Sequence, residues 1–417
     1  MEFSFMKKHL YTKELKSLII FRNLLKDEIL IKLMKLDTCD QDPETITDLY
    51  CDLAADILRQ GGSLTKWEKN SDGVVATYNY VSEGVKLKIH YVLEDDNLYI
   101  RAAVCGKATK LNDTLYRELT ILQKVSAMNG EAFRQAAADD TLFCWDTEKI
   151  NLKEIYTKHI ANIHVRGFGI FSRYHMFILS DGGKLIPIKH PDSQKLDELF
   201  GYEKERGKII QNTKALLKGG PANNVLLYGD AGTGKSSTIK AIVNEFQDRG
   251  LRLIELKKNQ LYLIPELIDS LAENPLKFIL FLDDLTFASD DRDFCTLKAI
   301  LEGGISNRGT NVAIYVTSNH RHLVKETMQD RQGDEISLGD KMQEITSLSA
   351  RFGLSITFSR PDKALYSDII INLAKEAKLQ IDEATLVNRA EAFAIRHGGR
   401  NPRTAKQFID LLISGVE

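Results

Sequence analysis

Five short apolar runs, separated by stretches that are polar or have helical spacing of apolar residues, dominate the chain after residue 191. They are NVLLYG, LRLIEL, KFILFLDD, NVAIYVTSN and LSITF. Continuous apolar runs of this length are typical of strands that are covered on both faces, as in a parallel sheet between two layers of helices. The pattern therefore predicts an α/β core with a five-stranded parallel sheet over residues 191–361. Residues 362–417 have only helical spacing, which predicts a small terminal bundle.

The region before residue 191 has a different pattern. Apolar residues recur at helical spacing over 15–36, 45–58 and 112–127. Residues 65–103 contain short apolar stretches separated by turn-forming clusters, which predicts an antiparallel meander. A further hairpin is expected around Asp181-Gly182-Gly183, between FSRYHMFIL and KLIPIKH. We therefore expect an α+β N-terminal domain over residues 1–190.

Composition narrows the classes of partner and compartment. Lys and Arg total 56 and Asp and Glu total 58, so no overall charge favours nucleic acid or an anionic membrane. The five cysteines are scattered, without a C-x-x-C pair, which argues against a disulfide framework or a zinc site. No apolar run approaches the roughly 20 residues of a membrane span, and the start lacks the layout of a signal peptide. We expect a cytoplasmic protein without membrane contact, whose partner is a protein rather than a nucleic acid.

The stretch LLYGDAGTGKSS follows the first of the apolar runs and fits G-x-x-x-x-G-K-[ST] over residues 229–236. Glycines allow backbone N–H groups to turn inward around phosphate oxygens, and the following helix adds its positive N-terminus. The pattern predicts that Lys235 contacts the β- and γ-phosphates and that Ser236 binds Mg²⁺. The candidate ATP-binding residues are Gly229, Asp230, Ala231, Gly232, Thr233, Gly234, Lys235, Ser236 and Ser237.

A second motif, FILFLDDL, ends an apolar strand with two carboxylates. In isolation such a pair is often a solvated acidic turn. Beside a phosphate-binding loop, the expected roles are different: Asp283 binds Mg²⁺, largely through water, and Asp284 polarises an attacking water.

Taken in order, the phosphate loop, the acidic strand end, the polar strand end Thr317-Ser318-Asn319, an S-x-R-F box and a C-terminal helical segment resemble an AAA+ ATPase. The resemblance covers residue 199 to the C-terminus. PANNVLLYGDAGTGKSS, FILFLDDLTF, LKAILEGG, TSNHRHLV and SLSARFGL are also similar to a bacterial family catalogued as domain of unknown function 815. That likeness extends upstream through GFGIFSRYHMFIL.

The AAA+ resemblance implies further roles. The strand that carries Asn319 lies between the phosphate-loop strand and the Asp283 strand, so Asn319 orients water against the γ-phosphate. Arg351 is supplied to a neighbouring subunit, and Arg403 lies on a helical lid formed by residues 362–417. Arg308 and Arg400 are the substitutes for these arginines. Gly201 and Tyr202, in LFGYEKERGKIIQNT, are the expected adenine contacts.

The resemblance implies a homo-oligomeric ATPase with nucleotide at subunit interfaces, which uses ATP and Mg²⁺ to remodel or load a macromolecule. Most AAA+ enzymes have Glu where this chain has Asp284, which is one methylene shorter, so we expect slow turnover. A nucleotide-gated switch with little turnover is the second reading, and a small-molecule kinase with the same loop is the third. The polar stretch 320–348 is expected to be a loop that contacts a partner.

Overall fold

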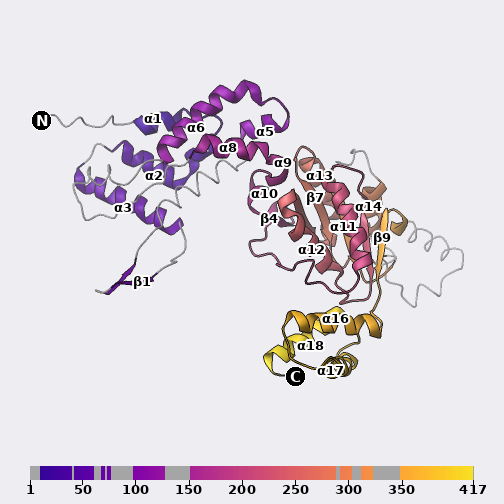
Figure 1. Ribbon diagram of the computed structural model, residues 1–417. Helices are drawn as coiled ribbons and strands as arrows, with labels where there is room; N and C mark the ends of the chain where they lie inside the picture. The colour runs from indigo at the N-terminus through magenta and orange to yellow at the C-terminus, as the bar shows by residue number, and fades with distance from the viewer. Residues whose placement is uncertain are drawn as a thin grey trace. The chain divides into compact units, whose positions relative to one another are not determined.

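The computed structural model describes residues 10–39, 42–60, 67–70, 73–76, 97–126, 151–287, 292–302, 311–321, 323 and 348–416. The chain divides into two compact units, Met1–Ile163 and His164–Glu417 (Figure 1). Residues 164–190, which the sequence pattern assigned to the N-terminal domain, are part of the second unit. No helix among the described residues is both long and apolar enough to cross a bilayer.

The first unit is mainly helical in its described part. Its elements are α1 (Leu10–Lys16), η1 (Arg22–Lys26), α2 (Glu28–Asp37), α3 (Pro43–Gln60), β1 (Trp67–Asn70), β2 (Gly73–Ala76), α5 (Leu98–Val104), η2 (Ala108–Leu111), α6 (Asn112–Ser126) and α8 (Leu152–Ala161). The short helix α9 (Ile163–Arg166) begins at the last residue of this unit and continues into the second. β1 and β2 pair antiparallel, as the meander predicts, and residues 77–96 lie outside the described residues.

The end of the predicted meander is wrong, because its last residues form helix α5. The side chain of Asn97 accepts a hydrogen bond from the backbone N–H of Ile100 at 3.0 Å and so caps the helix. Ile100 is fully buried. The helix cap at Asn97 and the burial of Ile100 therefore outweigh the strand preference of the residue types in this segment.

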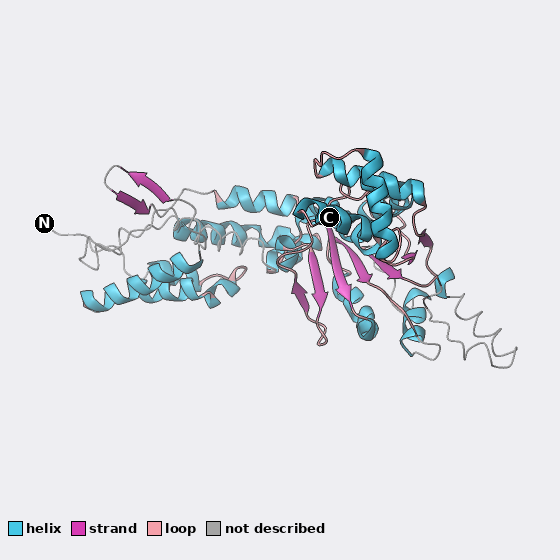
Figure 2. Ribbon diagram, turned by 90° about the horizontal axis from the view of Figure 1, so that it is seen from below, coloured by secondary structure: helices cyan, strands magenta, loops and turns pink. Residues whose placement is uncertain are grey.

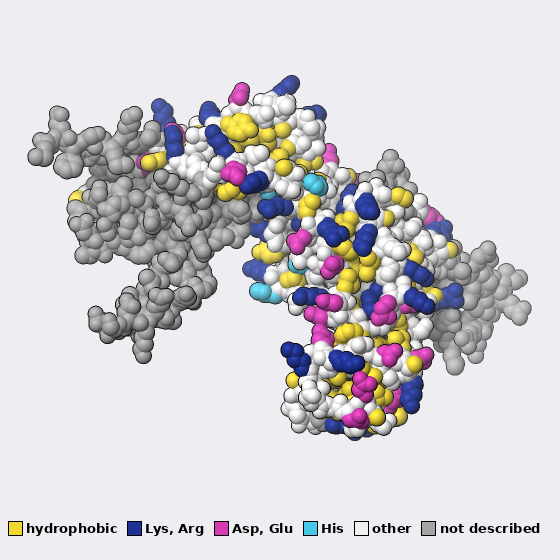
Figure 3. Space-filling view, in the orientation of Figure 1, with side chains coloured by type: hydrophobic (Ala, Val, Ile, Leu, Met, Phe, Trp, Pro, Cys, Tyr) yellow, Lys and Arg dark blue, Asp and Glu magenta, His cyan; other side chains and the backbone are white. Residues whose placement is uncertain are grey.

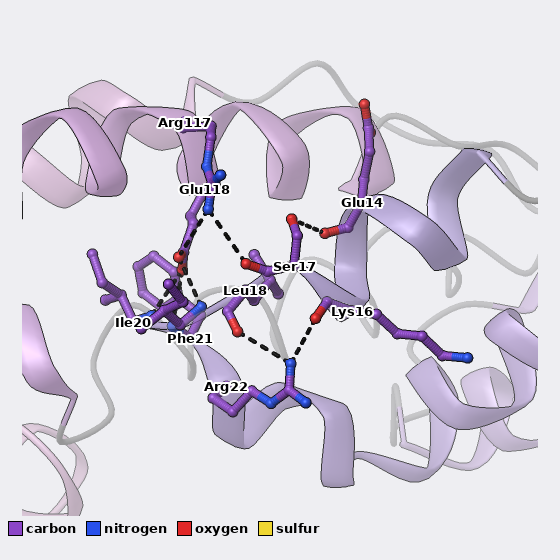
Figure 4. A network of polar contacts seen from close by, with 10 residues as sticks. Glu14, Lys16, Ser17, Leu18, Ile20, Phe21, Arg22, Arg117 and Glu118 are labelled. Atoms are coloured by element: carbon purple, nitrogen blue, oxygen red, sulfur yellow. Dashed lines mark hydrogen bonds and ion pairs between the residues drawn. The ribbon is translucent and has the colours of Figure 1, made fainter.

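A buried carboxylate fastens the start of the first unit to α6. Glu118 is fully buried, and its two oxygens accept hydrogen bonds from the backbone N–H groups of residues 19, 20 and 21 at 2.8, 3.0 and 3.1 Å (Figure 4). Hydrogen bonds to a charged acceptor are stronger than neutral ones, and three of them compensate for removing the carboxylate from water. Glu118 therefore fixes the turn between α1 and η1.

The second unit contains a seven-stranded sheet with the order β4-β3-β6-β7-β8-β5-β9. The strands are β3 (Met176–Leu179), β4 (Leu185–Pro187), β5 (Val225–Gly229), β6 (Leu251–Leu256), β7 (Lys277–Leu282), β8 (Val312–Ser318) and β9 (Leu354–Phe358). The five predicted core strands are parallel, and β8 lies between β5 and β7, as the AAA+ resemblance implies. Figure 2 shows these strands as neighbouring arrows with helices on both sides.

The sheet has two strands more than predicted. The hairpin expected around residues 181–183 is present as β3 and β4, but it extends the edge of the core sheet, where β3 pairs parallel with β6 and β4 pairs antiparallel with β3. Phe177 and Leu179 of β3 are buried in the same hydrophobic cluster as β6 and β7. This burial stabilises the added edge, and no local pattern reveals it, because pairing between distant strands is set by packing.

Helices cover both faces of the sheet. α11 (Glu203–Leu217) and α12 (Lys235–Phe246) share one hydrophobic cluster with Val225 and Leu227, and α13 (Ile264–Leu271) and α14 (Arg292–Glu302) share the other with Leu226. The alternation along β5 is that of a strand buried on both sides. α10 (Ile170–Arg173), η3 (Gln247–Arg249) and η4 (Lys258–Leu263) complete this core.

The lid is formed by α16 (Lys363–Glu376), α17 (Glu383–Arg396) and α18 (Pro402–Ser414), as the C-terminal pattern predicts. It has its own hydrophobic core, in which Tyr366, Phe393 and Phe408 are nearly or fully buried.

Lys and Arg side chains gather on the surface of the second unit where α11 lies (Figure 3). The exposed residues of that helix and its C-terminus include Lys204, Lys208, Lys214 and Lys218.

Candidate nucleotide-binding site

The predicted phosphate loop connects the end of β5 to the start of α12. Gly229 has φ 132° in close contact with β9, where a Cβ atom would lie 2.2 Å from the carbonyl oxygen of Phe358. Gly234 has φ 88° and immediately precedes the first helical residue, Lys235. Only glycine adopts both conformations without strain. These two positions explain why the loop turns tightly and presents its backbone to the cavity at the N-terminus of α12.

Lys235 is held inside the loop rather than in solvent. It is 7% exposed, and its Nζ donates hydrogen bonds to the carbonyl oxygens of Gly229 and Asp230 at 2.8 and 2.7 Å and to Asn319 Oδ1 at 3.1 Å. Burial lowers the pKa of Lys235, and the neighbouring carboxylates of Asp284, Asp230 and Asp283 oppose that shift.

Asp283, which follows the last residue of β7, is hydrogen-bonded to residues of α12 and β8. Its Oδ1 accepts hydrogen bonds from Ser236 Oγ on α12 and from Thr317 Oγ1 on β8, each at 2.5 Å. The structure thus brings together the two residues that the sequence assigns to Mg²⁺. Thr317 is an additional member that the sequence analysis noted only as a polar strand end.

The donor set fits Mg²⁺. Hydroxyl and carboxylate oxygens are the hard ligands that this ion prefers, and it usually takes one or two protein ligands, with water and substrate phosphates completing the octahedron. No group of three His, Cys, Asp or Glu side chains suited to a metal occurs among the described residues, so the site does not have the all-protein ligand set of a structural metal centre.

Asp284 has a left-handed backbone, with φ 49°, which Asp tolerates better than most residues. Its backbone N–H donates to Thr317 Oγ1 at 2.8 Å, and its carboxylate accepts a hydrogen bond from Asn319 Nδ2 at 2.6 Å. Asn319 therefore links Lys235 to Asp284 through the two ends of one amide. The amide orientation follows from this network, since Nδ2 donates to the carboxylate and Oδ1 accepts from the amine.

The lid contacts the phosphate loop directly. The backbone N–H of Arg403, in the first turn of α18, donates to the carbonyl oxygen of Gly232 at 3.2 Å, and Arg403 lines the cavity. Arg400 instead forms a bidentate ion pair with Glu391, with N–O distances of 2.8 to 3.0 Å, and does not line the cavity. Of the two candidate arginines, Arg400 and Arg403, the second is therefore the one at the site. Arg308 lies outside the described residues.

Arg351 lies far from the phosphate loop of its own chain. It precedes the amino end of β9 and pairs with Glu302 on α14, whereas Gly229 pairs with Phe358 at the carboxyl end of β9. β9 itself spans four steps from Leu354 to Phe358, or about 13 Å at the rise of an extended strand, and Arg351 lies in the turn before it. Arg351 does not line the cavity that contains the phosphate loop of its own chain.

The predicted adenine contacts do not line the cavity. Tyr202 has a left-handed backbone with φ 61°, which turns its ring against Phe358, and its hydroxyl donates to the carbonyl oxygen of Ser359 at 2.6 Å. Gly201 packs on Ile369 of the lid. The two preceding residues, Leu199 and Phe200, line the cavity instead.

The cavity has a volume of about 680 Å³, within the usual range for a bound nucleotide. It is lined by Gln194, Glu198, Leu199, Phe200, Arg206, Ala231, Gly232, Thr233, Gly234, Lys235, Ser236, Ser237, Thr238, Asp283, Asp284, Thr317, Asn319, Ile369, Leu373, Pro402, Arg403 and Lys406. Two cations of this lining, Arg206 and Lys406, were not predicted from the motifs. A signal for Arg206 was present, because this charged residue is in helical register with the buried Ile209, Thr213 and Leu216.

Residues 172–416 match the family described as Protein of unknown function (DUF815). No curated protein matches the chain. The solved structures that it resembles include the RuvB Holliday junction branch migration motor of Thermotoga maritima, at 18% identity and a TM-score of 0.36, over 53% of this chain and 66% of that one. A substituted variant of the same motor gives 17% identity and a TM-score of 0.36, over 54% and 67%. Since the family match covers more than half of its length, the chain belongs to the family described as Protein of unknown function (DUF815).

Proposed function

We propose that this chain is a Mg²⁺-dependent AAA+ ATPase with slow turnover, and that it binds ATP between the phosphate loop and the lid. The observation that carries the proposal is the hydrogen-bonded cluster at the carboxyl ends of β5, β7 and β8. It holds Lys235, Asn319 and Asp284 in one chain of contacts, and Ser236, Thr317 and Asp283 in another. Amine, amide, carboxylate and hydroxyl groups at these places suit phosphoryl transfer, which depends on positioning and electrostatic stabilisation.

Each group has a distinct role. The Lys235 amine exchanges the loop carbonyls for phosphate oxygens, and Ser236 with Asp283 holds the metal. Bound Mg²⁺ would neutralise charge on the phosphate oxygens. Asp284 accepts a proton from the attacking water, and the Asn319 amide keeps that carboxylate in place. Arg403 approaches the phosphates from the lid.

Two features favour slow turnover. The carboxylate of Asp284 is one methylene shorter than that of the usual Glu, and one of its oxygens already accepts a hydrogen bond from Asn319. The same features support the second candidate, a nucleotide-gated switch in which hydrolysis is incidental. A small-molecule kinase is the weaker alternative, because it does not need the series Asn319, Arg351 and Arg403.

The position of Arg351 supports assembly into homo-oligomers. An arginine before the amino end of β9, at the opposite end of that strand from the phosphate loop, is suited to stabilise transition-state charge at the site of a neighbouring subunit. We therefore place the nucleotide at subunit interfaces and assign Arg351 to the neighbour's site.

The partner is proposed to be a macromolecule that contacts the first unit or the 320–348 stretch, most of which lies outside the described residues. We favour a protein, and the exposed lysines of α11 make nucleic acid the control ligand in a binding test. The four cysteines within the described residues are free thiols, which supports a cytoplasmic location.

The test combines ATP hydrolysis with light-scattering mass, with and without Mg-ATP, for the wild type, Lys235→Ala and Arg351→Ala. We expect ATP-dependent assembly of the wild type, loss of nucleotide binding in Lys235→Ala, and loss of turnover with retained binding in Arg351→Ala. Assembly without turnover selects the switch. A monomeric wild type whose turnover is unaffected by Arg351→Ala overturns the interface mechanism.

A further inference from the structure

Arg206 is a buried cation on the wall of the nucleotide cavity. It lies in the first turns of α11, where its backbone N–H donates to the carbonyl oxygen of Tyr202 at 2.9 Å, and the residue is only 8% exposed. Among the described residues, the hydrogen-bond partner found for its guanidinium is Glu203, at 3.2 Å. The side chain of Glu203 is 73% exposed, so this pair offsets little of the cost of burial.

Arg206 lines the cavity. A guanidinium carries five N–H donors, and none of its nitrogens is among the fully buried, unsatisfied polar atoms of the described residues. Burial lowers the pKa of Arg206, and the carboxylates of Glu203 and Glu205 oppose that shift. A guanidinium still carries its charge under these conditions. A charged planar group is thus presented to a ligand from a mostly buried position.

Arg206 lines the cavity together with the apolar residues Leu199, Phe200, Ile369 and Leu373. Phe200 packs against the lid core that contains Ile369, and Gly201 lies on the same Ile369 side chain. Arg206 follows one helical turn later. The charged groups that act on it are both on its own helix, whereas Lys235 is influenced by Asp284, Asp230, Asp283 and Arg403. The lining thus combines the polar loop and carboxylates with a set of apolar side chains, and Arg206 closely follows two of these, Leu199 and Phe200, in the chain.

We propose that the Arg206 guanidinium recognises the base of the bound nucleotide rather than its phosphates. This inference rests on the proposed function. A planar cation is attracted to the face of an aromatic ring, and its N–H fork can donate to ring nitrogens at the edge. Leu199, Phe200, Ile369 and Leu373 supply the apolar walls that a base requires. Because of Arg206, the cavity therefore binds a nucleotide more tightly than a polyphosphate without a base.

The test compares two ligands by titration calorimetry in the presence of Mg²⁺: ATP, and inorganic tripolyphosphate, which lacks base and ribose. The variants are Arg206→Ala, Arg206→Lys, Lys235→Ala and the matched control Lys208→Ala. Lys208→Ala removes a positive charge from the exposed side of the same helix. In the two Arg206 variants and in Lys208→Ala, binding of tripolyphosphate shows that the phosphate loop is folded.

We expect Arg206→Ala to weaken ATP binding about tenfold, or ~1.4 kcal/mol, and to leave tripolyphosphate binding unchanged. Arg206→Lys should lose most of the same affinity, because it keeps the charge without the planar fork. Lys235→Ala should weaken both ligands, and Lys208→Ala neither. Equal weakening of both ligands by Arg206→Ala, or unchanged ATP binding, overturns the base role. A wild type that binds neither ligand overturns the proposed function itself.

Discussion

Replacing Asp284 with Asn isolates the charge of one carboxylate. Asn is among the few residues that accept a left-handed backbone, so the φ of 49° at this position imposes little added strain. The hydrogen bond from the backbone N–H to Thr317 Oγ1 does not use the side chain, and Asn319 Nδ2 can still donate to an amide oxygen. The fold and the nucleotide cavity should therefore be preserved in Asp284→Asn.

What the variant loses is a proton acceptor. General base catalysis contributes roughly 10² to 10⁴ in rate, so we expect turnover to fall at least about 100-fold. The affinity for ATP should change by less than about threefold, since the phosphate loop and Asp283 are intact. Phosphate release at saturating Mg-ATP measures the first quantity and titration calorimetry the second. Asp269→Asn, an exposed carboxylate on α13 outside the cavity, is the matched control for loss of one charge.

Turnover within about threefold of the wild type in Asp284→Asn would refute the base assignment, because no rate effect of the expected size would remain to explain. A fall in ATP affinity as large as the fall in rate would also contradict it. That result would indicate that Asp284 contributes to ground-state binding rather than to the chemical step.

Three further changes test other parts of the site. When the Arg351→Ala and Asp284→Asn proteins are mixed, part of the ATPase activity that each lacks alone should return. Some interfaces of the mixed oligomer then contain an intact Arg351 from one subunit and an intact Asp284 from the other. Absence of recovery on mixing contradicts action between subunits. Gly232→Ala should lower the free energy of unfolding by about 1–2 kcal/mol and weaken ATP binding. The reason is that φ of Gly232 is 79° and a Cβ atom there would lie 2.7 Å from Asn401 Oδ1. An unchanged melting temperature would contradict this close packing. Burial raises the pKa of Tyr202 to about 12 from 10.0, so its contribution to stability is present below pH 10 and is lost as the pH rises toward 12. Denaturant titrations at pH 9 to 11.5 should then show a shallower loss of stability in Tyr202→Phe, and an equal slope in both proteins is the contrary result.

The phosphate loop and the strand before Asp283 could be predicted because their requirements are local. Gly229 and Gly234 stand where the backbone has positive φ, and the apolar run before Asp283 is typical of a buried strand. In both cases a few adjacent residues carry the constraint. The position of β8 between β5 and β7 is not local, and it was expected only from the resemblance to AAA+ proteins.

The features that escaped prediction depend on contacts between distant segments. The β3–β4 hairpin could be expected as a hairpin, yet its place at the edge of the core sheet depends on pairing with β6. The position of Tyr202 depends on its packing against Phe358, more than 150 residues later in the chain. Its left-handed backbone turns the side chain away from the cavity, and no spacing rule in the surrounding sequence gives that direction.

Arg206 differs from these cases, because its register with Ile209 and Leu216 could have been recognised in the sequence. A charged residue at an apolar position of a helix is costly unless something compensates for its burial. An exposed Glu203 compensates only in part, and the cavity is the other environment available to the guanidinium. A charged residue in register with the buried face of a helix is therefore informative about a nearby cavity. In this chain it indicates the part of the nucleotide cavity that the loop and strand-end motifs leave undefined.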